Sequence, residues 1–219
     1  MMCCCALLAL SAQARAAADE PESIYGKQMV FSVWRSGSEI GKHYVEFARD
    51  GGTLRVESRL ELVVRLVGIP VFRYRYYAKE NWRQESLQGL DVKIDNDGTP
   101  LAIDAKRVGD KIDVSGPAGA FAIPGVIMPT THWDMRIVNE NEVLNTTNGK
   151  LNHVNVVKGK VEQIAMANGK IDATHYVYTG DIQAEVWYDS AGHWVKLRFL
   201  GKDGTPVEYI CEVCTAPKP

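Results

Sequence analysis

One segment of the sequence, residues 130–134, carries side chains that could do chemistry together. A histidine beside a hydroxyl and a carboxylate can transfer protons, so one hypothesis is a hydrolase or isomerase that uses His132 with Thr131 or Asp134. A second hypothesis is that Thr131 and His132 are polar contacts at the mouth of a ligand pocket. The third is structural: Thr131 caps a short helix, Trp133 packs in the core, and His132 has no role.

No other catalytic or metal-binding pattern is present in the sequence. The nucleophile elbow, the zinc-protease helix, the phosphate-binding loop and the dinucleotide fingerprint are all missing. The five histidines do not form a close pair at metal-ligand spacing. His43 shares a strand face with Val45 and Phe47, which favours a hydrogen-bonded core histidine. We therefore assign no catalytic residue, no metal and no cofactor, and we expect a protein that is not an enzyme.

The cysteine pair Cys211 and Cys214 has the C-x-x-C spacing of redox and zinc motifs. Alternation around Cys211 predicts a strand instead, and residues three apart in a strand lie about 10 Å apart. A disulfide needs Cα atoms within roughly 7 Å, so this pair can bond only if the strand ends near Glu212. A small terminal disulfide or inert thiols, an intermolecular bridge and a functional pair all stay open.

The N-terminus has the pattern of an export signal. Residues 3–12 form a short apolar run, and Ala16-Ala17-Ala18 offers a cleavage site. We expect residues 1–18 to be a signal peptide, residues 19–219 to be a single periplasmic domain, and the mature chain to have no transmembrane span. A formal charge of −2 gives no electrostatic reason to expect nucleic acid binding.

The elements that must position these residues are strands. Residues 54–66 alternate between an apolar and a charged face, which is typical of a half-buried antiparallel strand. Gly-rich turns separate this run from similar ones along the chain. The fold class is therefore all-β: an antiparallel meander that forms a strongly curved sheet or incomplete barrel. Arg73 and Arg75 would lie on a solvated face that Glu57, Glu61 and Glu80 balance, and the alternative is a basic concave face that holds anionic head groups.

One stretch departs from the strand pattern. Residues 116–129 are apolar but contain three prolines and three glycines, so we expect a loop there. Thr131 with Asp134 resembles a capping box, which predicts one short helix near residues 131–139. The loop at 117–129 and the helix would then act as a lid over the sheet.

Residues 187–199, WYDSAGHWVKLRF, resemble the closing hairpin of an exported bacterial family known only as a domain of unknown function. Four further stretches are similar to the same family: residues 31–35, 68–74, 116–119 and 129–133, the last reading PTTHW. The resemblance implies a periplasmic, all-β, half-barrel-like protein, and it implies no activity. The C-x-x-C tail is not part of this pattern.

These observations favour a non-enzymatic envelope protein that binds a lipid or another apolar or amphipathic molecule in the hollow of its sheet. The alternative is an interaction module that presents a sheet edge or residues 150–170 to an envelope protein. The ligand-binding candidates are Thr131, His132, Trp133, Phe121, Ile127, Tyr74, Tyr76 and Trp187.

Overall fold

The computed structural model describes residues 21–215, so the expected signal peptide lies outside the described residues. A short helix, α1 (Pro21–Tyr25), precedes the first strand. The strands and the second short helix are β1 (Gln28–Arg35), β2 (Ser38–Asp50), β3 (Thr53–Leu66), β4 (Ile69–Arg83), β5 (Ser86–Asn96), β6 (Thr99–Val108), β7 (Lys111–Gly116), β8 (Gly119–Pro124), β9 (Met128–Pro129), η1 (Met135–Asn139), β10 (Glu142–Leu144), β11 (Leu151–Met166), β12 (Gly169–Gly180), β13 (Ala184–Asp189), β14 (Trp194–Leu200) and β15 (Pro206–Val213).

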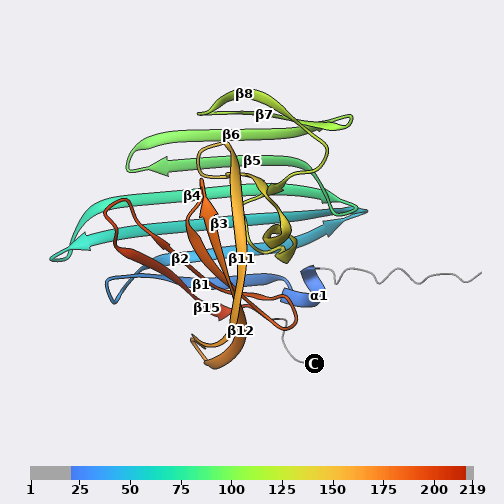
Figure 1. Cartoon of the computed structure of the whole chain (residues 1–219). Helices are drawn as coiled ribbons and strands as arrows, with labels where there is room; N and C mark the ends of the chain where they lie inside the picture. The colour runs from blue at the N-terminus through green and yellow to red at the C-terminus, as the bar shows by residue number, and fades with distance from the viewer. Residues whose placement is uncertain (1–20, 216–219) are drawn as a thin grey trace, which may run out of the picture.

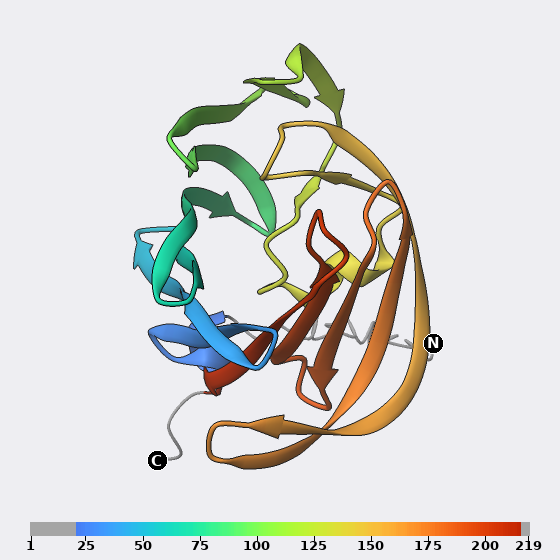
Figure 2. The same ribbon diagram turned by 90° about the vertical axis from the view of Figure 1, so that its left-hand side faces the viewer.

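The strands form one 15-stranded sheet whose order follows the chain in two arms (Figure 1). The first arm runs from β1 out to β8, and the second runs from β15 back to β9. Antiparallel pairing of β1 with β15 joins the two arms at the centre of the sheet. The strands β8 and β9 are the two edges and do not pair, so the barrel stays open. The arms face each other across the interior (Figure 2), which confirms the expected incomplete barrel.

Alternation along the strands sets the concave face. In β3, Leu54, Val56, Ser58 and Leu60 are all buried, whereas Arg59 between them is exposed. The same alternation continues in the neighbouring strands, where Val45 of β2 and Ala78 of β4 are buried on the same side. The concave face therefore carries the core, as expected of an antiparallel sheet with one solvated face.

The expected loop at 117–129 is wrong for most of its length. Residues 119–124 form β8, which pairs with β7 in register from Lys111 and Pro124 to Gly116 and Gly119. A strand can hold Pro124 here because β8 is an edge strand and needs only one row of hydrogen bonds. Only a short connection remains before β9, so this stretch is not a lid.

The short helix lies where the sequence predicts it, but its start and type differ. It is the 3₁₀ helix η1, and its N-cap is Asp134, whose carboxylate accepts from the backbone N–H of Arg136. Thr131 is therefore not the cap, and Trp133 precedes the helix. Two further elements were not expected: the helix α1 and a parallel pairing of β9 with β10. The segment that holds η1 packs inside the curved sheet, where Trp133 lies 5.5 Å from Trp82, ring centre to ring centre.

Candidate functional site

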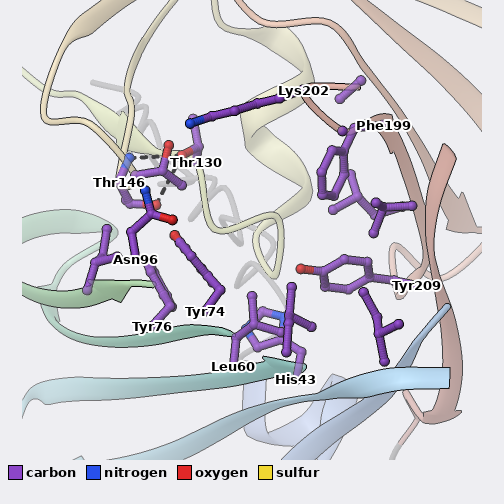
Figure 3. A pocket seen from close by; sticks show the side chains of 18 of the residues that line it. His43, Leu60, Tyr74, Tyr76, Asn96, Thr130, Thr146, Phe199, Lys202 and Tyr209 are labelled. Atoms are coloured by element: carbon purple, nitrogen blue, oxygen red, sulfur yellow. Dashed lines mark hydrogen bonds between the residues drawn. The ribbon is translucent and has the colours of Figure 1, made fainter. Parts of the chain in front are cut away.

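A hollow of about 920 Å³ lies between the two arms of the sheet (Figure 3). Its walls come from β1 to β6 on one side and from β13 to β15 on the other. Residues 130–132, 145–148, 182–183 and 201–203 complete them. The exposed side chains of Lys202 and Asp203 mark its outer end. The volume falls in the range of small-molecule sites, which is roughly 300–1,000 Å³.

The longest wall of the hollow is apolar, and it follows from the alternation of β3 and β4. Leu60, Leu62 and Val64 line it from β3, and Phe72 and Tyr74 line it from β4. The register pairs Leu62 with Tyr74 and Val64 with Phe72, so the two strands present one continuous surface. Such a surface excludes water from an apolar ligand.

A small polar corner faces this wall. The hydroxyls of Thr130 and Thr146 lie 3.2 Å apart, and the backbone N–H of Thr146 donates to the Thr130 hydroxyl at 3.1 Å. Asn145 donates to the side chain of Asn152 at 2.9 Å and fixes the loop that follows. Asn96 lies near the same corner in Figure 3. A few fixed polar groups in an apolar site are what orient a bound ligand.

The structure brings together four of the eight ligand-binding candidates. Thr131, His132, Tyr74 and Tyr76 line the hollow. Phe121, Ile127, Trp133 and Trp187 do not line it. Trp133 and Ile127 are buried in the core, and Phe121 is half-buried on the edge strand β8.

Trp187 lies on the opposite face of β13 from the hollow. It stacks on His175 with ring centres 4.4 Å apart, and its indole N–H donates to Glu162 at 3.0 Å. Lys196 completes this cluster, with its ammonium 4.9 Å from the centre of the indole ring. Trp187 is therefore half of a packed aromatic pair and not part of the wall.

His132 lines the hollow in a strained backbone conformation. Its φ of 57° lies in the left-handed region, and the Tyr188 hydroxyl holds it there by donating to its carbonyl oxygen at 2.9 Å. Its Nδ1 is buried and has no hydrogen-bond partner. Among the described residues no hydrogen bond joins its ring to Asp134, and the Nε of Arg136 donates to both carboxylate oxygens of Asp134, at 3.0 and 2.9 Å. The geometry shows no proton relay between His132 and Asp134.

His43 is one of the residues of the hollow that sequence reasoning missed, together with the β3 wall and the polar corner described above. It lines the hollow, and neither of its ring nitrogens has a hydrogen-bond partner, so the expectation of a hydrogen-bonded core histidine is wrong. Alternation places His43 on the inner face, but the sequence does not show what lies opposite. Burial lowers the pKa of His43 to about 3, and the nearby His132 contributes to this shift.

Glu80 is fully buried, so its expected place on a solvated face is wrong. Both Trp82, at 2.7 Å, and Trp133, at 3.1 Å, donate an indole N–H to its Oε2. Burial raises the pKa of Glu80 to about 7, while these two donors oppose the shift. The alternation along β4 could have predicted this burial, because Glu80 lies two residues after Ala78 and four after Tyr76, on the same inward face of the strand.

At the end of the last strand of the chain, β15, a disulfide bond joins Cys211 and Cys214, whose Cα atoms lie 5.9 Å apart. The strand β15 ends at Val213, which lets the chain turn and brings the two cysteines within bonding distance.

Within residues 21–215, no three His, Cys, Asp or Glu side chains gather where they could bind a metal ion. The same residues contain no helix with the length and hydropathy needed to cross a membrane.

The chain belongs to the family described as domain of unknown function DUF6134, whose model matches residues 31–212. The family likeness expected from the sequence is thus confirmed. Among solved structures, the chain is similar to the crystal structure of a β-barrel-like protein of domain of unknown function DUF1849 from Brucella abortus. The identity is 10%, the match covers 90% of this chain and 99% of that chain, and the TM-score is 0.62, which shows a shared fold. No curated protein matches the chain.

Proposed function

We propose that this DUF6134 protein is a non-enzymatic periplasmic protein that binds an apolar or amphipathic small molecule in the hollow between its two arms. The observation that carries the proposal is the hollow itself, with about 920 Å³ enclosed by apolar side chains and a few fixed polar groups. A sheet that served only as a scaffold would gain stability by filling such a volume with side chains.

The absence of a proton relay at His132 supports binding over catalysis. Asp134 is held by Arg136, and His132 lacks a carboxylate partner to orient its ring. A histidine base in an enzyme of this type is held in orientation by a hydrogen-bonded carboxylate, and His132 has none among the described residues. The side chains of the hollow are suited to holding a molecule, and the export signal expected at residues 1–18 supports a periplasmic location.

A probe-binding experiment on two neighbouring positions of β3 tests this proposal. Leu62 lines the hollow, and Val63 points to the other face of the same strand. We expect the delipidated protein to bind the neutral fluorescent probe N-phenyl-1-naphthylamine. The Leu62→Trp variant places a bulkier side chain in the path of the ligand and should bind the probe at least about ten-fold more weakly, whereas Val63→Trp should stay within about two-fold of the wild type. Equal binding by both variants would contradict the proposal.

A second candidate function is an interaction module of the cell envelope. Val157 and Val161 of β11 are exposed by 52% and 66%, and they lie in the segment 150–170 that the sequence offers to a partner. Exposed apolar side chains on one strand can bind another protein. This function would be favoured if an envelope protein co-purified with the wild type and did not co-purify with the Val161→Lys variant.

A further inference from the structure

The inner end of the hollow is formed by two histidine side chains. Both ring nitrogens of His43 and the Nδ1 of His132 are buried without a hydrogen-bond partner. The two imidazoles pack against the same indole, because the ring centre of Trp194 lies 5.9 Å from that of His43 and 5.6 Å from that of His132. In Figure 3, His43 lies beside Leu60, at the opposite end of the hollow from Lys202.

Leaving these nitrogens without partners is costly. A buried polar group that lacks a hydrogen bond costs about 1–3 kcal/mol, and native proteins leave few of them. Three such atoms beside the inner end of one hollow, next to a strained backbone at His132, indicate a site that a bound molecule completes once the side chains that cover these atoms move aside.

The protonation state of the two histidines decides which functional group of a ligand can bind between them. Burial lowers the pKa of His43 to about 3 and that of His132 to about 4, so both rings are neutral at pH 7. A neutral imidazole offers one N–H donor and one nitrogen acceptor. A hydroxyl likewise donates and accepts, whereas a carboxylate only accepts and would bury a charge.

We propose that the hollow binds an apolar molecule by a hydroxyl-bearing end, which lies between His43 and His132, while its hydrocarbon part follows Leu60, Leu62 and Phe72 outward. This inference rests on the proposed function, since it names the chemical class of the ligand of the same hollow. The ligand is an alcohol, and it binds with its polar end inward.

The test compares three molecules of similar length as competitors of N-phenyl-1-naphthylamine at pH 7.5: dodecan-1-ol, dodecanoate and tridecane. We expect the wild type to bind the alcohol at least about ten-fold more tightly than the acid or the alkane. His43→Phe and His43→Leu remove the donor and acceptor but keep an apolar side chain. Both should reduce this preference to below about two-fold.

The control is His153→Phe, because the His153 side chain is 75% exposed and lies outside the hollow. It should keep the full preference for the alcohol. A second readout is the ¹⁵N NMR signals of the histidine rings, which should shift on addition of dodecan-1-ol at His43 and His132 but not at His153.

Acid binding equal to or tighter than alcohol binding would overturn the assignment of the ligand class and leave the binding function intact. An alcohol preference that survives both His43 variants would overturn the role of the histidines. Failure of the wild type to bind the fluorescent probe at all would overturn the proposed function itself.

Discussion

The interior of the curved sheet has a packed end and a hollow end, and the histidines of the two ends differ in their hydrogen bonding. At the packed end, the Tyr25 hydroxyl donates to the carbonyl of Trp133 and accepts from the N–H of Trp194, both at 2.9 Å. His193 there lies 2.5 Å from Asp189 and 3.0 Å from the carbonyl of Ile24. At the hollow end, His43 has no partner on either nitrogen. The contrast supports the proposal that the hollow end is kept open for a ligand while the packed end stabilises the fold.

The largest expected effect comes from breaking the packed end. Trp133 contacts Trp82 and Phe47 and donates to Glu80, so Trp133→Ala leaves a cavity and removes one of the two donors to Glu80. We expect the free energy of unfolding to fall by about 3–5 kcal/mol, as measured by urea denaturation. A loss below about 1 kcal/mol would show that this end is not packed as described.

The buried carboxyl of Glu80 gives the packed end a pH dependence. Because its pKa is raised from 4.5 to about 7, the native state holds the proton more tightly than the unfolded state does. The free energy of unfolding should therefore fall by about 3 kcal/mol as the pH rises from 4.5 to 7. Glu80→Gln should match the wild type near pH 4.5 and be more stable at pH 8. Parallel pH profiles of the two proteins would contradict this account.

The same substitution at two histidines should have opposite signs. His193→Phe leaves the largely buried Asp189 without its imidazole partner and should destabilise the protein by about 2 kcal/mol. His43→Phe removes an imidazole that has no partner and should stabilise the protein by about 1 kcal/mol at pH 7. Denaturation curves of both variants check the comparison, and a loss of stability in both would contradict it.

The smallest effect should come from truncating the wall of the hollow. Leu62→Ala enlarges a space that is already open, so we expect a loss of about 1 kcal/mol or less. Leu87→Ala is the matched control at a fully buried position of β5 and should cost about 2–5 kcal/mol. Equal losses at the two positions would mean that the hollow is as closely packed as the core.

Alternation was sufficient to predict the all-β fold, and it put Tyr74 and Tyr76 on the inner face that lines the hollow. It could not show that the distant strands β1 and β15 pair, because that contact depends on how both arms curve. It also could not separate Thr131 and His132, which reach the hollow, from Trp133, which packs against Trp82. Neighbours on distant strands decide which side chains fill space and which border it.

The position of His43 could be predicted from the sequence, but its lack of hydrogen bonds could not. Alternation along β2 places His43 on the inner face. Its hydrogen bonding, however, depends on its neighbours from distant parts of the chain, which lie in β14 and in the segment before η1. Glu80 is different, because its parity with Tyr76 and Ala78 was visible in the sequence, and only its charge argued for the surface.

Native mass spectrometry tests the central claim most directly. The wild type and Leu62→Trp would be produced from the full gene, purified gently without organic solvent, and compared before and after solvent extraction. We predict that the wild type carries an added small-molecule mass that extraction removes and that Leu62→Trp lacks this mass. An added mass that is equal in both proteins, or absent from the wild type, would contradict the assignment of the hollow as a ligand site.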